Sequence, residues 1–477
     1  MSEKQIQPLS YEILKSAVER EAAAIRCVSR LEPAGGQGDK VFPPTYAGGV
    51  YAVEHRCLKN GNGELEVVRC VLLDSVQSQA NRLEQSLLRA YDGGMKFPLM
   101  VVNFAKKQDG AEQEDEEIRG IGRITTLDAP HRIADAIFRD SVMPNGKAFR
   151  DSDDGMAFEK ANIRNATALF KLCPTALVFG TWDSTGSRGG LGNKFARALV
   201  SEIIGVNTTV GVRTASRIDP LGIEKCDLYE DEKGDWTVHR DKAKKDPKGE
   251  PIKYGPRGKD KGKPSAIIHG NVTPHFPRYT TDDVQDSTPD VLKSSRVELQ
   301  YAINAENGRL SSRTFVQSDE PPIRAGEIKP GGVTIEYALQ TTVLSLPGLR
   351  RLRFPDKDGK ASVERDNAAR TVLAALALAA VAHQIEAGWD LRSRCLLIPT
   401  TDVIPVEIVK TSASGDRFIL TASESVKLFK AAVREASDHG LTWKEEATEI
   451  ELRPMDKLVD LVREGRKATV RAQPEGA

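Results

Sequence analysis

The spacing of apolar and polar residues along the chain predicts a mixture of helices and strands. Apolar positions three or four residues apart predict helices over residues 10–25, 75–89, 193–204, 365–387, 423–439 and 454–464. Alternating or continuous apolar runs predict strands over residues 51–57, 65–73, 100–104, 176–182, 333–346 and 393–399. The sequence has no internal repeat and no coiled-coil heptads, and the mixture of elements predicts an α+β fold.

Glycine, proline and charge mark the connections between these elements. A glycine- and proline-rich connector covers residues 32–46, and a turn at residues 59–63 is expected to join the first two strands in a hairpin. Residues 108–117 are so acidic that we expect an exposed loop there. The helix over residues 365–387 is dense in alanine and leucine and ends at Gly388, so we expect it to pack tightly against a sheet.

The helix at residues 75–89 combines an apolar stripe with an unusually polar opposite face. Asp74 is expected to cap this helix, with Gln77 answering it at the third helical position. The apolar stripe consists of Val76, Ala80, Leu83 and Leu87. The outward positions are then Gln77, Ser78, Asn81, Arg82, Gln85 and Arg89. Amides and hydroxyls beside a guanidinium hydrogen-bond phosphate and ribose oxygens, so this face is a candidate nucleic-acid contact; a solvated amphipathic helix explains the same pattern without a ligand.

A glycine-rich turn at residues 183–194 is a second candidate site. Its glycines allow backbone amides to converge, and the helix expected behind them would offer a partial positive charge to an oxyanion. The spacing fits neither a Walker A loop nor a dinucleotide-binding fingerprint, so nucleotide hydrolysis and dinucleotide redox chemistry have weak support. A phosphate contact and a strand-to-helix turn with a flexible tip both remain open.

Composition permits a nucleic-acid binder without requiring one. The 477-residue chain exceeds the usual size of one domain, and its 39% hydrophobic and 29% charged residues are ordinary for a globular protein. Its net charge is zero, with 68 basic and 68 acidic residues, which counts against a freely diffusing nucleic-acid binder unless the charges are segregated. Six cysteines without zinc-finger spacing predict neither a metal site nor a cofactor. With no signal peptide or bilayer-length apolar run in the sequence, we expect a cytoplasmic protein that does not contact a membrane.

The charges are segregated along the chain. Residues 240–263 hold ten lysines and arginines against four acidic residues, a local net charge of +6. This composition predicts a mobile insertion that stays disordered until it meets a polyanion, although a solvated linker fits it equally well. The arginines at 349–354 lie beside an expected hairpin end, and they are candidates for a phosphate or a neighbouring subunit, or simply solvated charges.

The sequence does not indicate catalysis. Metal-independent RNA cleavage needs a general base near pKa 7, but none of His131, His269, His275 and His383 falls in a motif with an acid or base partner. The carboxylates are not clustered as a two-metal nuclease requires. We therefore assign no catalytic residues and do not expect an enzyme.

Four strings in the sequence carry a family resemblance. They are FPPTY at residues 42–46, VLLDSVQSQANRLE at 71–84, GGVT at 331–334 and LRRLRF at 349–354. From about residue 41 to about residue 398, the chain resembles the backbone subunit of type I-G (formerly I-U) CRISPR effector complexes, which belongs to the RAMP superfamily. The resemblance implies an RRM-like (ferredoxin-like) palm with large insertions. It also implies a protein that binds the spacer part of a CRISPR RNA in several adjacent copies.

The resemblance also implies partners and an organisation of the chain. The partners are the CRISPR guide RNA, target DNA, further copies of the chain, the other subunits of the effector complex and an indirectly recruited helicase-nuclease. We expect the palm in residues 1–217 and 320–477, and a thumb-like insertion in residues 218–319. The candidate RNA contacts are Ser75, Gln77, Ser78, Asn81, Arg82, Ser187, Arg188, Asn193, Lys194, Arg350 and Arg351. The alternative functions are a CRISPR-RNA-processing endoribonuclease of the same superfamily and a nucleotide-dependent enzyme that uses the glycine-rich turn.

Overall fold

Two units of the chain are distinguished by their internal contacts. The computed structural model describes residues 6–20, 22–46, 50–59, 61–105, 116–184, 193–212, 226–255, 261–262, 299–303, 310–314, 330–410, 415–443 and 448–472. The first unit comprises residues 1–209 and 333–459, and the second comprises residues 210–332 and 460–477.

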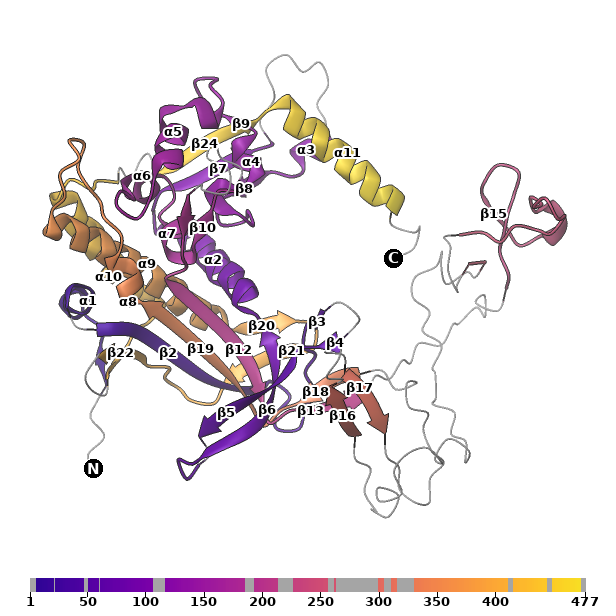
Figure 1. Cartoon of the computed structure of the whole chain (residues 1–477), viewed down its shortest axis with the longest axis horizontal. Coiled ribbons are helices and arrows are strands. Elements are labelled where there is room, and N and C mark those ends of the chain that lie inside the picture. The colour runs from indigo at the N-terminus through magenta and orange to yellow at the C-terminus, as the bar shows by residue number, and fades with distance from the viewer. Residues whose placement is uncertain are drawn as a thin grey trace. The chain divides into compact units, whose positions relative to one another are not determined.

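A large sheet forms the frame of the first unit (Figure 1). Its main strands follow the order β1 (Gln7–Pro8), β23 (Asp416–Ile419), β22 (Val406–Lys410), β2 (Ala22–Pro33), β19 (Tyr337–Ser345), β12 (Leu199–Val206), β6 (Leu65–Asp74) and β5 (Val53–Lys59). In addition, β21 (Cys395–Pro399) pairs with β2 and with β20 (Trp389–Arg392). β1 and β23 pair in parallel, and the other described pairs of this sheet are antiparallel.

One face of this sheet is covered by helices (Figure 1). They are α1 (Tyr11–Glu19), α2 (Val76–Asp92), α8 (Leu346–Arg350), α9 (Val363–Ala387) and α10 (Ala422–Asp438). α9 contacts both α2 and α10, and α2 also packs on β12. Every second residue of β19 is buried, as expected for a strand with one face against helices.

Helix α9 is the core helix that its composition predicted. It ends at Ala387 with Gly388 at the C-cap, and almost every residue from Ala368 to Ala382 is buried. Within the described part of the chain, α9 is the one helix long and apolar enough to cross a bilayer, but 89% of its apolar window is buried by protein. This burial is typical of a helix in the core of a folded domain.

A second, smaller sheet and several short helices complete the first unit. The strands follow the order β8 (Arg123–Thr125), β7 (Leu99–Asn103), β24 (Glu449–Pro454) and β9 (Ser141–Val142). The short helices are α3 (Glu116–Arg119), η1 (Arg132–Ala134), α4 (Ala136–Arg139), η2 (Phe149–Asp151), α5 (Asp153–Lys160), α6 (Thr167–Leu172) and α7 (Thr175–Phe179). Two small hairpins pair β3 (Thr45–Tyr46) with β4 (Val50–Tyr51) and β10 (Thr181–Trp182) with β11 (Lys194–Phe195).

The remaining elements include those of the second unit. They are β13 (Thr209–Val212), β14 (Tyr229–Glu230), β15 (Trp236–Thr237), η5 (Arg240–Lys242), β16 (Leu299–Ile303), β17 (Leu310–Thr314), β18 (Pro330–Thr334) and α11 (Asp456–Ala472). β14 pairs with β15, β16 with β17, and β13 with β18.

The structure confirms the α+β class and corrects several predicted elements. The helix predicted to reach residue 25 ends at Glu19, and strand β2 follows. From Ile25 to Leu31 the buried residues alternate with exposed ones, which is the period of a strand with one covered face. The helix predicted over residues 454–464 begins at Asp456 instead, because Pro454 still belongs to β24.

Between residues 175 and 206, the predicted types of the elements were wrong. Where a strand was expected, α7 precedes the two-residue strand β10, and where a helix was expected, β11 and β12 follow. β12 is buried along most of its length and pairs with β19 and β6 on its two sides, so its apolar run has no clear period. Gly205 does not end a helix: a Cβ there would lie 2.6 Å from Ile335 Cγ2, so glycine permits close packing within the sheet.

Candidate nucleic-acid interface

Helix α2 begins directly after β6, with a different cap from the one predicted. Ser75 is the N-cap residue, and its hydroxyl accepts a hydrogen bond from the Ser78 amide at 3.3 Å. Asp74 is fully buried as the last residue of β6, and Ser78 is half-buried. The prediction that Asp74 caps the helix is therefore wrong, because interior side chains hold its carboxylate.

The outer face of α2 carries a line of polar side chains, which we call the α2 stripe. Its members are exposed and recur every four residues, so they lie along one side of the helix. They are Gln77, Asn81, Gln85 and Arg89. The opposite side is buried through Ala80, Leu83 and Leu87, as their spacing predicted.

A buried network of polar side chains fastens the inner side of α2 to the sheet and to α9. Gln79 is fully buried, and its Oε1 accepts hydrogen bonds from the Ser201 hydroxyl at 3.0 Å and from Gln340 Nε2 at 2.8 Å. Gln340 Nε2 also lies 3.1 Å from Gln384 Oε1, and Trp389 Nε1 donates to Gln340 Oε1 at 2.7 Å. Buried amides with satisfied hydrogen bonds fix one arrangement of helix and sheet, so the position of the α2 stripe is set from inside.

Arg82 is half-buried, and its guanidinium is directed towards the interior and not along the outer face. Its Nε donates to the buried Asp74 carboxylate at 2.9 Å, and its two other nitrogens donate to the carbonyls of Asp390 and Leu391. Arg392 Nη2 binds the same carboxylate at 3.2 Å. The prediction that Arg82 points outward is therefore wrong, because its guanidinium compensates a buried charge and ties α2 to β20.

The neighbours Asn81 and Arg82 should respond differently to alanine. We expect Asn81→Ala to change the free energy of unfolding by less than about 0.5 kcal/mol, as for ordinary surface substitutions. Arg82→Ala removes one partner of a buried carboxylate that keeps others, so we expect a loss of about 1–3 kcal/mol. Urea denaturation of the two variants measures the difference, and equal unfolding midpoints would contradict the interior position of Arg82.

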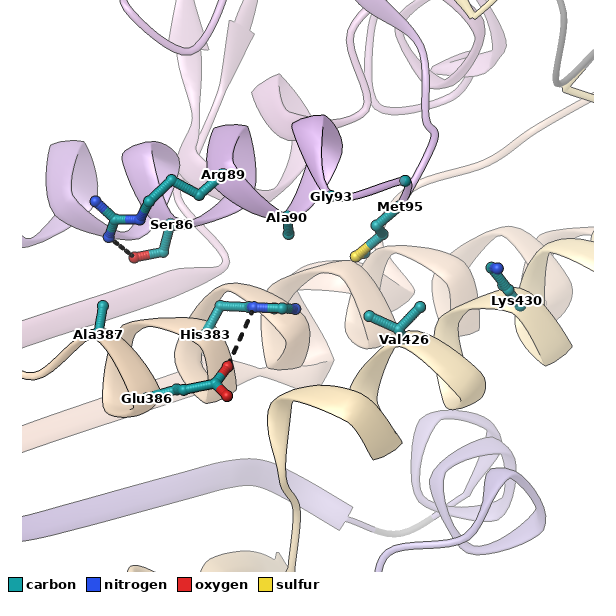
Figure 2. Close-up of a pocket in the computed structure, with 11 residues that line it drawn as sticks. Ser86, Arg89, Ala90, Gly93, Met95, His383, Glu386, Ala387, Val426 and Lys430 are labelled. Atoms are coloured by element: carbon teal, nitrogen blue, oxygen red, sulfur yellow. Dashed lines mark hydrogen bonds and ion pairs between the residues drawn. The ribbon is translucent and has the colours of Figure 1, made fainter.

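The α2 stripe ends at a groove between α2, α9 and α10, which Figure 2 shows in close-up. The groove has a volume of about 390 Å³. Its apolar lining comes from Ala90, Met95, Ala387 and Val426. Its charged and titratable lining comes from Arg89 on α2, His383 and Glu386 on α9, and Lys430 on α10.

The surroundings of His383 in this groove favour the neutral imidazole. Its Nδ1 lies 3.8 Å from Glu386 Oε2, and its Nε2 is buried with no hydrogen-bond partner in the part of the chain that the structure describes. Burial lowers the pKa of His383; the Glu386 carboxylate opposes this shift and the Arg89 guanidinium adds to it. The permanent positive charge of the groove therefore comes from Arg89 and Lys430.

Helix α10 adds further cations beside Lys430. Lys427, Lys430 and Arg434 are exposed and three or four residues apart, so they share one face of the helix. Among the described residues, no carboxylate forms an ion pair with any of the three, or with Arg89. We call Arg89 and Lys430, which line the groove, the groove cations. Exposed cations without carboxylate partners are the groups that neutralise nucleic-acid phosphates.

The glycine-rich turn does not precede a helix. It connects β10 to β11, so the argument from a helix N-terminus does not apply to it. Ser187 and Arg188 lie outside the described residues. Asn193 is buried, and its side-chain amide donates to the Phe158 carbonyl, whereas Lys194 is exposed with its ammonium 5.5 Å from the centre of the Trp182 ring.

Arg350 is the last residue of helix α8, and Arg351 and Arg353 come directly after it, so these arginines do not lie beside a hairpin end. Arg350 donates from Nε and Nη2 to the carbonyls of Val18 and Ala17, both at 2.8 Å, near the C-terminal end of α1. Arg353 forms an ion pair with the buried Asp366 at 2.7 Å. The prediction that Arg350 is available to a phosphate is therefore corrected, because its guanidinium caps carbonyls of α1. Arg351 is exposed and has no ion pair within the described ranges.

The basic segment, residues 240–263, has more local structure than its composition predicted. Its described residues 240–255 contain η5, and the bridge between Lys245 and Pro251 folds the chain back on itself. Several of its cations are paired: Arg240 with Glu250 at 3.3 Å, and Lys244 with Glu230 at 3.4 Å. Turns and acidic neighbours therefore supply local partners to these residues, and the mobility of the segment stays a prediction.

Sequence reasoning missed the cations on α10 and the exposed indole of Trp182. The spacing of Lys427, Lys430 and Arg434 was a usable signal, since the helix itself was predicted. Trp182 gave no such signal, because it closes an apolar run that predicts a buried strand. Its side chain is instead 53% exposed.

The fold and the α2 stripe define an α+β protein with a polar, cation-lined surface on the helical side of its sheet. Residues 25–210 match the family model for CRISPR-associated protein GSU0053 (Cas_GSU0053), and this segment includes all of α2. The match supports a CRISPR-associated protein with a role in CRISPR defence. No curated protein matches the chain.

Proposed function

We propose that this chain is the guide-RNA-binding backbone subunit of a type I-G CRISPR effector complex, of the RAMP superfamily. The observation that carries the proposal is the α2 stripe, an exposed row of amides ending in an arginine, within the segment that matches a CRISPR-associated family. The string at residues 71–84, on which the resemblance mainly rests, runs from β6 into α2. Its inner residues hold the helix in place, and its outer residues remain available to a ligand.

The chemistry of the stripe suits a nucleic-acid backbone whose bases must stay free. The side-chain amides of Gln77, Asn81 and Gln85 offer both donors and acceptors. They can hydrogen-bond ribose hydroxyls and phosphate oxygens, and they carry no net charge. From Gln77 to Arg89 the helix rises about 18 Å, so the stripe is long enough to follow several nucleotides. The groove cations at its end add the charge that neutralises phosphates.

The proposal includes the partners that the resemblance implies. The chain binds the spacer part of the CRISPR RNA beside further copies of itself and presents the bases to target DNA. Other subunits of the effector complex complete the particle, and a recruited helicase-nuclease destroys the target. We propose an RRM-like palm for the first unit, a thumb-like role for the insertion after residue 217, a cytoplasmic location and no catalytic activity of the chain itself.

A CRISPR-RNA-processing endoribonuclease is the second candidate, and His383 is the observation that favours it. His383 lines the same groove as Arg89 and Lys430. A histidine and cations are the residue types that a metal-independent ribonuclease site uses. However, His383 Nε2 is buried and Nδ1 faces Glu386, so neither nitrogen is presented to a substrate. Incubation of purified protein with repeat RNA in EDTA separates the two functions, because defined cleavage products that disappear in His383→Ala would establish the ribonuclease.

Particle size should depend on the guide. If copies of the chain bind side by side along the spacer, a longer guide holds more copies, so we expect the mass of the RNA-bound particle to increase with guide length. Light scattering after size-exclusion chromatography, on complexes reconstituted with short and long guides, measures this mass. A small oligomer of the same mass on every guide would contradict side-by-side binding.

A further inference from the structure

Trp182 is an exposed indole at the surface of the first unit. Its side chain is 53% exposed, although tryptophan is among the residues that proteins bury most extensively on average. Its indole N–H has no hydrogen-bond partner among the described residues. Thr181 and Phe195, the other residue pair of the hairpin, are both buried, so Trp182 is not the centre of a larger apolar patch on β10 and β11.

The backbone beneath Trp182 is held firmly. Trp182 pairs with Lys194 across the β10–β11 hairpin, and the Asp183 amide donates to the Asn193 carbonyl at 2.8 Å. Asp183 is buried and forms an ion pair with Arg150, and the Asn193 side chain is bound to the Phe158 carbonyl on α5. An exposed ring on a fixed support loses little conformational freedom when a ligand stacks on it.

A lysine accompanies the ring. The Lys194 ammonium lies 5.5 Å from the centre of the Trp182 ring, within the range of a cation–π contact. Lys194 is exposed and has no ion pair with a described carboxylate. A flat aromatic surface and a neighbouring cation match the two halves of a nucleotide, because a base stacks on the ring while its phosphate meets the ammonium.

We propose that Trp182 is a stacking platform for an unpaired base of single-stranded RNA, with Lys194 as the contact for the adjoining phosphate. The inference rests on the proposed guide-binding function, since it names a contact of the same RNA outside α2. A protein partner is the competing occupant of an exposed tryptophan, but such anchors sit at the centre of apolar surfaces, and Trp182 is bordered by a lysine. Base stacking also tolerates any sequence, as a guide-binding subunit requires.

The test compares Trp182 with Trp236, a matched tryptophan that is 48% exposed in the second unit. The other two of the four tryptophans, Trp389 and Trp443, are buried, so in a Trp236→Phe background an exposed-tryptophan signal reports Trp182. We expect single-stranded RNA to quench this fluorescence. We also expect Trp182→Ala to bind RNA about 5- to 150-fold more weakly and Trp236→Ala to bind like the parent. Trp182→Phe keeps a ring and should retain part of the affinity.

Each other outcome is decisive. RNA binding by Trp182→Ala equal to the parent, without quenching in the reporter background, overturns the stacking platform and leaves the proposed function intact. Unchanged RNA binding together with lost association with the other effector subunits assigns the indole to a protein contact and also overturns it. Failure of the parent itself to bind RNA removes both the platform and the proposed function. Circular dichroism of each variant confirms that it is folded.

Discussion

Replacement of Arg132 by methionine is expected to lower the free energy of unfolding by about 3–5 kcal/mol, because it leaves a buried carboxylate without its counter-charge. Arg132 Nε and Nη2 bind the two oxygens of Glu84 at 2.6 and 2.8 Å, and Nη1 donates to the Gly180 carbonyl at 3.0 Å. The exposed fractions of the two side chains are 8% and 3%. Urea denaturation at pH 8 measures the loss.

The loss should depend on pH. Burial raises the pKa of Glu84 to about 7, against the lowering effect of the Arg132 charge, from an ordinary value of 4.5. An acid whose pKa is higher in the folded state holds its proton more tightly there, so its contribution favours folding at low pH and is lost as the pH rises towards 7. Without Arg132 the pKa rises further, so the deficit of Arg132→Met should be smaller at pH 5 than at pH 8.

Two controls separate the buried pair from a general effect of losing an arginine. Arg26→Met removes an ion pair with Glu407 in which the Arg26 side chain is 44% exposed, and we expect a cost below about 1 kcal/mol. Glu84→Leu combined with Arg132→Met removes both charges and should recover most of the stability. A deficit of the same size at both pH values, or no recovery in the double variant, would contradict the role given to the pair.

The second large effect is expected on RNA affinity, from removal of two groove cations. Each charge-assisted contact contributes about 1.5–3 kcal/mol when fully made, and exposed contacts lie at or below the low end of that range. We therefore expect Arg89→Gln with Lys430→Gln to weaken guide binding about 10- to 100-fold at low salt. Two lost phosphate contacts should also reduce the slope of log affinity against log salt by about 1.4.

A matched variant controls for the change in total charge. Lys410→Gln with Lys457→Gln removes one lysine on β22 and one on α11. Their side chains are 46% and 65% exposed. We expect this variant to reproduce the salt dependence of the parent. Parallel salt plots for the parent and the Arg89/Lys430 variant would remove the groove from the RNA-binding surface.

The sequence predicted the elements whose period is unambiguous. α2 and α9 begin and end near the predicted residues, because α2 has one clear apolar stripe and α9 has alanine-rich turns closed by Gly388. β12 was predicted as a helix, since a strand buried by sheet neighbours on both sides and by a helix on one face leaves no period of two in its sequence. The start of β2 was also predicted as part of a helix, because the alanines there favour helices.

The candidate site was predictable only where exposure follows from helical geometry. Gln77 and Asn81 are exposed, as their distance from the apolar stripe indicated. Arg82 and Arg350 looked equally available in the sequence, but their partners lie in segments remote along the chain, at Leu391 and at Val18. Gln79 also has remote partners: Ser201 and Gln340 come from strands that sequence spacing cannot bring together. Partners of this kind are set by tertiary packing, which no local pattern encodes.

The most direct test is the RNA content of the protein after co-expression with its CRISPR array and the other effector subunits. A guide-binding backbone subunit should purify with an ultraviolet absorbance ratio typical of a ribonucleoprotein, and the extracted RNA should have the length and sequence of the spacer-containing guide. The same preparation of Arg89→Gln with Lys430→Gln should retain less of this RNA. Protein that is free of RNA, or that carries random cellular RNA regardless of the array, would contradict guide binding.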